Sequence, residues 1–347
     1  MNKIIIPTGY MGSGSSAITD LISEYDGYDA DNGSFEYVFM HCPNGLFDLE
    51  DKLLTGNNAL RSDEALHSFR QEMKELYERR FWWPGNYKAN VSENFMNYTD
   101  DFIKSLIDFE PDYYWYYQEK LDFKAFVQMV IRKICLVISG GRIELKKPLT
   151  HPQIWLSMPS KEEFYAKARV YTDNIWTALG RQQHNLILDQ LLLPSNLNRM
   201  KNYFDDDTEC FVVERDPRDV FISNKYIWPK QASAVPYPTD VHEFCRMYRR
   251  MRMAQYNEIS EHIHVFHFED IIYDYERSIE RVQQILGLTR EQHVRQRESF
   301  DPEKSIHNTQ LFRSGRYQKE MKIIEDELSE YLYDFPYEID VELGKVF

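Results

Sequence analysis

Two short segments of the chain combine residue types that bind phosphate groups. The first is the glycine-rich stretch Gly9-Tyr-Met-Gly-Ser-Gly-Ser-Ser16, which follows the apolar run Ile4-Ile-Ile6. The second is Arg215, with Ser223 eight residues later. Glycine-rich loops leave backbone N–H groups free to face an anion, and an arginine offers a planar fork of donors to phosphate oxygens. These residue types predict the binding of a phosphorylated ligand.

The residues around Arg215 predict a strand that turns into a helix. Cys210-Phe-Val-Val213 is a β-branched and aromatic run typical of a buried strand, and Asp216-Pro217 is typical of a helix N-cap and first turn. Arg215 is therefore expected at the carboxyl end of a strand, where open α/β sheets bind ligands. Ser223 is expected about two turns along the following helix. The alternative is that Arg215 and its acidic neighbours only brace the turn.

The amino-terminal segment predicts a strand, a phosphate-binding loop and a helix. Ile18, Leu21 and Ile22 recur at helical spacing after a Gly-x-x-x-x-Gly-x-Ser frame, which is the spacing of a P-loop. Ser15, however, occupies the position of the nucleotide triphosphatase lysine. Without that cation the loop is poorly equipped to hold β- and γ-phosphates with magnesium, whereas a single 5′-phosphate still fits.

Together the two segments resemble those of the sulfotransferases that use 3′-phosphoadenosine 5′-phosphosulfate (PAPS). In that family a lysine or arginine precedes Ser-Gly-Thr-Thr or a close variant, and Ser13-Gly-Ser-Ser16 matches the last four positions. The family also has a strand-end arginine with a serine eight residues on, as in Arg215 and Ser223. The resemblance implies a three-layer α/β/α fold with a central, mostly parallel sheet, similar to P-loop NTPases. It also implies PAPS as donor, 3′,5′-ADP as product and no metal ion.

The resemblance further implies which residues contact the donor. Arg215 and Ser223 correspond to the residues that hold the 3′-phosphate. The 5′-phosphosulfate corresponds to the loop residues Gly12, Ser13, Gly14, Ser15, Ser16 and Ala17. The segment 265–272 and the helix that ends at Leu286-Gly-Leu288 look like the family's late strand and helix.

The segment 307–319 resembles a basic loop that folds over the 3′-phosphate in family members. Arg313 and Arg316 are the candidates for that contact. The alternative is that both are solvated surface arginines.

One position departs from the family pattern. The residue before Ser13 is Gly12, where the family has the lysine or arginine that stabilises charge near the bridging oxygen. Either another cation enters the site, or transfer is slow, or the chain binds PAPS-like nucleotides without catalysis. The candidate replacement cations are Arg142, Lys146, Lys147, Arg181 and Arg313.

Sulfuryl transfer also needs a base for the acceptor. Tyrosyl-protein and carbohydrate sulfotransferases carry a glutamate shortly after the first helix, and Glu36 lies in that neighbourhood. His41 and Asp189 are the other candidate catalytic residues. The alternatives are a salt bridge or surface acid for Glu36, a packed histidine for His41, and a cap of the helix near 195–197 for Asp189.

The composition favours one α/β domain. A chain of 347 residues with 43% hydrophobic content can bury a full core. Because the sheet motifs lie within 1–30 and 185–290, we expect a single domain over 1–347 with a mainly helical insertion at about 50–180. Within that insertion, hydrophobic spacing predicts helices over 60–80, 101–109, 117–138 and 161–179.

The negative net charge of the chain limits the kinds of partner that it can bind. A net charge of −15 argues against a nucleic-acid partner and disfavours highly anionic acceptors. The basic run 248–252 is interpreted as the solvated face of a helix over 241–259.

The chain shows no targeting signal, and its longest apolar stretch, 124–138, is interrupted by Gln128, Arg132 and Lys133. The four cysteines have no metal-ligand spacing and are interpreted as reduced thiols. We therefore expect a cytoplasmic enzyme that transfers sulfate to a hydroxyl or amine of a small molecule, saccharide or lipid. The oligomeric state is not predicted. The alternative functions are a P-loop kinase that uses ATP, and a noncatalytic nucleotide-binding protein.

Overall fold

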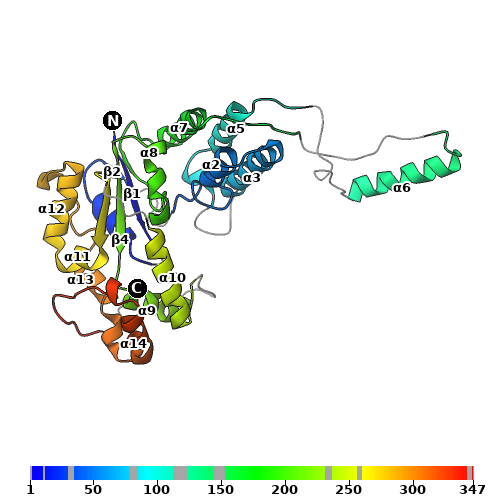
Figure 1. Ribbon diagram of the computed structural model, residues 1–347. Coiled ribbons are helices and arrows are strands. Elements are labelled where there is room, and N and C mark those ends of the chain that lie inside the picture. The colour runs from blue at the N-terminus through cyan, green and yellow to red at the C-terminus, as the bar shows by residue number, and fades with distance from the viewer. Residues whose placement is uncertain are drawn as a thin grey trace.

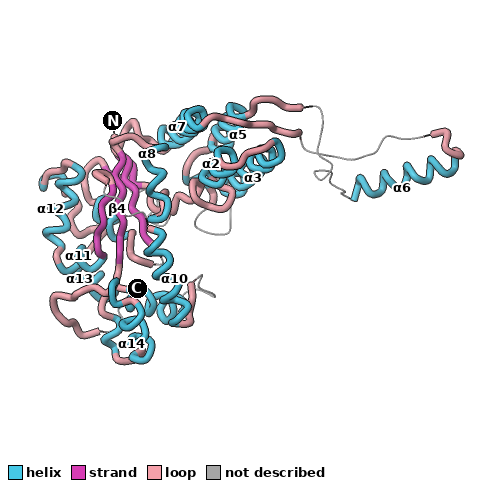
Figure 2. Tube along the Cα trace, in the orientation of Figure 1, coloured by secondary structure: helices cyan, strands magenta, loops and turns pink. Residues whose placement is uncertain are grey.

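Five parallel strands form the central sheet, in the order β2-β3-β1-β4-β5 (Figures 1 and 2). The computed structural model describes residues 2–10, 12–29, 35–78, 85–111, 123–143, 153–230, 237–255, 260–341 and 346. The strands are β1 (Ile4–Gly9), β2 (Tyr28–Asp29), β3 (Asn185–Ile187), β4 (Thr208–Glu214) and β5 (Ile263–His267). The predicted α/β fold with a parallel sheet is confirmed, and every pairing in the sheet is parallel.

Successive side chains of the central strands pack alternately against the helices on the two faces of the sheet. Ile4 and Ile6 of β1 belong to one buried cluster and Ile5 to another. Strand β4 alternates in the same way, with Val212 in the first cluster and Val213 in the second. Successive side chains of a strand point to opposite faces, so both strands are covered on two sides.

The helices that cover the second face are α1 (Ser16–Ser23), α11 (Phe268–Tyr273) and α12 (Tyr275–Leu286). Those between β2 and β3 are α2 (Leu46–Leu54), α3 (Ala59–Glu78), α4 (Tyr87–Asn90), α5 (Phe95–Leu106), α6 (Phe123–Ile138) and α7 (Lys161–Ala178). The remaining ones are α8 (Met200–Tyr203), α9 (Pro217–Ile222), α10 (Val241–Ala254), α13 (Pro302–Ser305) and α14 (Gln318–Glu327).

The segment between β2 and β3 supplies the largest hydrophobic cluster. Helices α2, α3, α5 and α7 pack together through a set of buried aromatic rings that includes Phe69, Phe95, Phe102 and Tyr171. The helices predicted in this segment are observed, with α5 beginning and ending earlier than predicted. The single-domain boundaries stay a prediction. Among the described residues no helix is both long and apolar enough to cross a membrane.

The junction after β4 forms as the sequence predicts. Asp216 is the N-cap of α9 and its carboxylate accepts a hydrogen bond from the backbone N–H of Arg218, while Pro217 is the first helical residue. Helix α9 is shorter than predicted, because Ser223–Ile227 forms a π turn at its end. Such turns often occur at functional sites.

The carboxyl ends of the strands bring distant parts of the chain to one edge. Asp219 in α9 is fully buried, and its two carboxylate oxygens accept backbone hydrogen bonds from Gln310 and Leu311, at 2.7 and 2.8 Å. These bonds fix the carboxyl-terminal segment against the start of α9. The segment therefore lies beside Arg215, close to the residue expected to bind phosphate.

Candidate functional site

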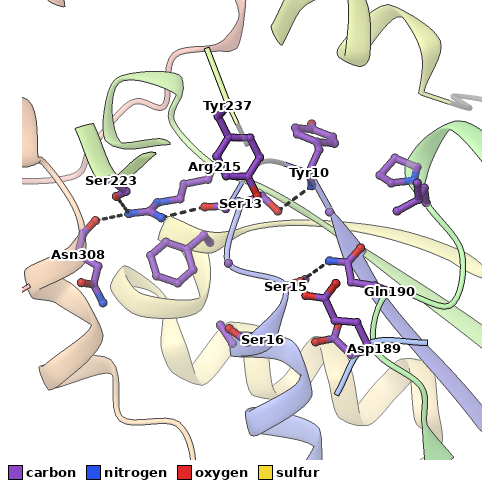
Figure 3. A pocket seen from close by; sticks show the side chains of 18 of the residues that line it. Tyr10, Ser13, Ser15, Ser16, Asp189, Gln190, Arg215, Ser223, Tyr237 and Asn308 are labelled. Carbon is purple, nitrogen blue, oxygen red and sulfur yellow. Dashed lines mark hydrogen bonds between the residues drawn. The ribbon is translucent and has the colours of Figure 1, made fainter. Parts of the chain in front are cut away.

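A pocket of about 720 Å³ opens at the carboxyl edge of the sheet (Figure 3). The residues that follow four of its strands line it: Tyr10 and the loop Gly12–Ala17 after β1, Asp189 and Gln190 after β3, Arg215 after β4 and Phe268 after β5. This is the edge where parallel α/β sheets bind ligands. The structure therefore brings the two predicted phosphate-binding segments together.

The glycine-rich loop is folded as an anion cradle. Ser13 closes it, because its hydroxyl accepts a hydrogen bond from the Tyr10 backbone N–H and its own N–H donates to the Tyr10 carbonyl. Gly12 and Gly14 have φ angles of +76° and +88°, which favour glycine. Among the described residues, no acceptor faces the backbone N–H groups of Gly14, Ser15 and Ser16. Free amides at the start of a helix suit a phosphate or sulfate group.

Gly12 has a steric reason to lack a side chain. A Cβ atom at this position would lie 2.7 Å from Cη2 of Trp228. The indole therefore occupies the space into which a lysine or arginine side chain would begin to extend. At Gly12, where the sequence departs from the family motif, the ring of Trp228 takes the place of the basic side chain.

Arg215 is the cationic centre of the pocket. Its side chain is only 7% exposed and donates to the carbonyl of Gly12 at 3.0 Å and to that of Asn308 at 2.6 Å (Figure 3). Its guanidinium also lies 3.4 Å from the hydroxyl of Ser223 and 4.9 Å from the centre of the Phe268 ring. No acceptor for its Nε–H is found among the described residues. Arg215 thus joins the loop to the carboxyl-terminal segment and keeps one donor unused.

Three carboxylates occupy the other end of the pocket: Asp20, Glu36 and Asp189. Burial raises the pKa of Glu36 to about 7. Burial, with the charges of Glu36 and Asp20, raises the pKa of Asp189 to about 8. The pKa of Asp20 is raised to about 6 by burial and by the charge of Glu24. These groups exchange protons near neutral pH, as a general base must.

Glu36 and Asp189 are therefore both in reach of a ligand in the pocket. No ion pair of Glu36 is found within the described part of the chain, and Asp189 does not cap the turn Pro194–Arg199, which has no side-chain cap. The side chain of Asp189 is half-buried, and its Oδ1 atom meets no hydrogen-bond donor among the described residues. The described contacts therefore show neither an ion pair of Glu36 nor a helix cap by Asp189.

His41 does not line the pocket. Its ring Nε2–H donates to the carbonyl of Gln190 at 2.8 Å, and burial lowers its pKa. Gln190 has a φ angle of +57°, and its amide group donates to the Ser15 hydroxyl at 2.9 Å. His41 therefore contacts the turn that holds Gln190 against the loop, and its role as a catalytic residue stays a prediction.

The candidate arginines of the carboxyl-terminal segment lie outside the pocket lining. Arg313 pairs with Glu338 at 2.7 Å, and Arg316 is exposed. Instead, the carbonyl oxygen of Asn308 meets Arg215, so the segment reaches the site with its backbone. The contact of these two arginines with a 3′-phosphate stays a prediction.

None of the described replacement cations reaches the pocket either. Arg142 is exposed beyond α6, and Arg181 pairs with Asp207 beside the backbone of Asn2, at the amino-terminal edge of the sheet. Lys146 and Lys147 lie outside the described residues. Among the described residues that line the pocket, Arg215 is the only lysine, arginine or histidine.

Several residues of the site escaped the sequence-based prediction. Trp228, Gln190, Phe268 and Asn308 each contact a loop residue or Arg215. Gln190 follows Asp189, a candidate catalytic residue, and Asn308 is the second residue of the predicted basic segment, so proximity in sequence was the available signal. Phe268 and Trp228 give no such signal, because an aromatic residue after a strand is usually a packing residue.

Comparisons with known proteins add two structural similarities. The sequence matches no protein-family model and no curated protein. The sulfotransferase domain of the Synechococcus PCC 7002 olefin synthase is 11% identical with a TM-score of 0.36, over 99% of this chain and 90% of that chain. Sulfotransferase STF9 from Mycobacterium avium is 12% identical with a TM-score of 0.38, over 98% of this chain and 78% of that chain.

The Gly14→Ala variant tests the loop geometry. The new Cβ atom would lie 2.6 Å from Cδ2 of Phe268 at a φ of +88°. Gly287 has a φ of +69° with no atom within 4 Å, so Gly287→Ala adds only the backbone cost of about 1 kcal/mol. We expect urea unfolding to give a larger loss of stability for Gly14→Ala, by about 1 kcal/mol or more. Equal losses in the two variants would contradict the close packing of Phe268 on the loop.

The Asp189→Asn variant tests the protonation of the acidic end. A folded-state pKa near 8, above the usual value near 4, means that the folded protein holds a proton that the unfolded chain releases. This contribution to stability is present at pH 4 and is lost as the pH rises to about 8. From pH 5 to pH 9, wild type should therefore lose about 4 kcal/mol more than Asp189→Asn in urea unfolding, about 1.4 kcal/mol for each pH unit up to 8. Asp101→Asn, at an exposed position of α5, is the control and should follow wild type; if Asp189→Asn does so too, the raised pKa is refuted.

Proposed function

We propose that this chain is a PAPS-dependent sulfotransferase that transfers a sulfuryl group to a hydroxyl or amine of a small-molecule, saccharide or lipid acceptor. The observation that carries the proposal is the pairing of two phosphate-binding features in one pocket. A lysine-free anion loop lies directly beside a buried arginine whose guanidinium donates to Gly12 of that loop. PAPS has two anionic groups on one nucleoside, a 5′-phosphosulfate and a 3′-phosphate.

The two ends of the pocket match the two halves of the reaction. Within the loop Gly12–Ala17, the N–H groups of Gly14, Ser15 and Ser16, which face no acceptor among the described residues, suit the 5′-phosphosulfate. The guanidinium of Arg215 with the Ser223 hydroxyl suits the 3′-phosphate. Asp189 lies on the other side of the loop from Arg215, where an acceptor would approach (Figure 3), and the charges of Glu36 and Asp20 act on it there. Glu36 and Asp189 would there face the acceptor's proton.

The proposed transfer is an in-line displacement at sulfur. The acceptor oxygen or nitrogen forms a bond to sulfur while the bond from sulfur to the bridging oxygen of the 5′-phosphate breaks, which leaves 3′,5′-ADP. Glu36, with a pKa near 7, takes the acceptor's proton. Negative charge grows on the leaving phosphate, and the loop amides at the start of α1 stabilise it.

A noncatalytic nucleotide-binding protein is the second candidate function. The observation in its favour is the ring of Trp228 over Gly12, where the resembling family has a cation. A kinase that uses ATP is less well supported, because Ser15 occupies the position of the P-loop lysine that holds β- and γ-phosphates.

The proposed place of action is the cytoplasm. Cys42, Cys135, Cys210 and Cys245 form no disulfide bond with one another, and a reducing compartment keeps thiols in that state.

Nucleotide selectivity tests the donor site. We expect calorimetry to give tighter binding for 3′,5′-ADP than for 5′-AMP, which lacks only the 3′-phosphate, and than for ADP or ATP with magnesium. In Arg215→Ala the preference for 3′,5′-ADP over 5′-AMP should fall by roughly 30-fold, or about 2 kcal/mol, because a charge-assisted contact to the 3′-phosphate is lost. The control is Arg250→Ala, an exposed arginine of α10 outside the pocket lining.

A second variant guards against a simple loss of folding. Arg215→Lys keeps a positive charge and should retain part of the preference, whereas Arg250→Ala should retain all of it. Tighter binding of ATP with magnesium than of 3′,5′-ADP would overturn the PAPS site in favour of the kinase.

The Glu36→Gln variant tests catalysis. Transfer of radiolabelled sulfate from PAPS to a panel of phenols, amines, saccharides and lipids should fall about 100-fold, while the affinity for 3′,5′-ADP is unchanged. In wild type kcat/KM should rise with pH and level off above about 7, as Glu36 loses its proton. Glu298→Gln, at an exposed position outside the pocket lining, is the matched control.

Other outcomes of the same assay assign the role differently. Full activity in Glu36→Gln with a 100-fold loss in Asp189→Asn would make Asp189 the base. No transfer to any acceptor by wild type, with 3′,5′-ADP still bound, would favour the noncatalytic protein.

A further inference from the structure

Helix α6 carries its apolar side chains on the face that solvent reaches. Phe123, Val137 and Ile138 are 83%, 71% and 80% exposed, whereas Ala125 on the other side is buried and Met129 is half-buried. Figure 1 shows α6 apart from the sheet and the helices that cover it. A surface helix of a globular protein normally packs its apolar face inward, so an apolar face that is left exposed in this way requires a partner.

The exposed apolar face is continuous and has charged borders. With about 100° between successive helical residues, one arc of about 140° contains only apolar side chains. Its members are Phe123, Phe126, Val127, Val130, Ile131, Ile134, Val137 and Ile138, all of them exposed. Lys124 and Lys133 lie just outside its two edges, and both are exposed.

The charge of this region is opposite to that of the rest of the chain. Residues 123–143 contain Lys124, Arg132, Lys133 and Arg142 and no acidic residue, whereas the whole chain has a net charge of −15. Arg142 and Ile143 directly beyond the helix are also exposed. An anionic surface therefore complements α6 and repels the remainder of the protein.

The length of α6 sets the way in which it can meet a bilayer. Its 16 residues extend about 24 Å, which is shorter than the hydrocarbon core of about 30 Å. A helix with one apolar face and basic borders instead lies in the plane of the interface. Lysine stems at the two edges can then follow the apolar face while their ammonium groups reach the lipid phosphates.

We propose that α6 is an interfacial anchor, which binds the surface of an anionic phospholipid bilayer through its apolar face and its flanking lysines. The proposal does not rest on the function of the nucleotide pocket. It gives the chain a second binding surface, remote from the pocket, whose ligand is a lipid surface rather than a soluble molecule.

A second copy of the chain is a poorer occupant for this face. Two α6 helices packed together would bring basic residues against basic residues, with no acid from α6 to balance them. The other large hydrophobic residues that are exposed in the described part of the chain are scattered over distant elements: Phe109, Met158, Val170, Met247, Met253, Val265, Val294 and Tyr337. They form no second run like that of α6.

Vesicle sedimentation of the full chain tests the anchor. Wild type should partition at least 10-fold more strongly to vesicles of equal phosphatidylcholine and phosphatidylglycerol than to phosphatidylcholine alone, and 0.5 M salt should weaken this preference. Ile134→Asp, in the apolar face, should lower binding at least 10-fold. Gln128→Asp adds the same charge on the polar side and should lower it less than threefold. The double variant Lys124→Glu, Lys133→Glu should abolish the preference for anionic vesicles.

Three results would overturn the anchor. Wild type could remain in the supernatant with both vesicle types, or Ile134→Asp and Gln128→Asp could bind vesicles equally well. Alternatively, analytical ultracentrifugation could reveal a dimer of wild type that Ile134→Asp dissociates, which would assign the face to a second copy. Circular dichroism and 3′,5′-ADP binding, measured on every variant, report on folding and on the nucleotide pocket separately.

Discussion

The contacts of one buried arginine hold the functional edge of this protein together. Arg215 follows the central strand β4 and donates to the carbonyls of Gly12 and Asn308, which belong to opposite ends of the chain. A buried guanidinium is costly unless its donors are used, so its position constrains both the loop and the carboxyl-terminal segment. Asp219 supports the same arrangement by holding the backbone of Gln310 and Leu311. The geometry of the anion site therefore depends on contacts between segments that lie far apart in the sequence.

The basic and the acidic side chains of the pocket lie at different ends of it. Arg215 provides positive charge at one end. At the other end burial raises the pKa values of Glu36 and Asp189, and the charges of Glu36 and Asp20 raise that of Asp189 further. Under the proposed function, this division separates the group that recognises the donor from the groups that accept a proton. The Trp228 ring occupies the space that a lysine side chain at position 12 would need. In the proposed reaction, the loop amides would therefore stabilise the charge on the leaving phosphate. A reaction that relies on amides alone is expected to be slower than one with a nearby cation.

Local patterns in the sequence predicted the parts of the site that are formed locally. The apolar run before Arg215 and the Asp216-Pro217 pair predicted the strand, the N-cap and the helix, because each signal acts over a few residues. The contacts of Phe268 and Asn308 with Arg215 arise from tertiary packing, which no local pattern encodes. For the same reason the interpretation of the basic run 248–252 as a solvated face holds only in part: Arg250 is exposed, but Tyr248 is buried and Arg252 pairs with Glu214 at 2.6 Å. Similarly, hydrophobic spacing predicted α6 but not that its apolar face is exposed.

The proposed donor site would bind a nucleotide with both a 3′- and a 5′-phosphate between the loop and Arg215. A crystal structure of the protein with 3′,5′-ADP tests this site most directly. We expect the 3′-phosphate within hydrogen-bond distance of Arg215 and Ser223, and the 5′-phosphate on the amides of Gly14, Ser15 and Ser16. A nucleotide bound elsewhere, or bound with its 3′-phosphate away from Arg215, would contradict the proposed site.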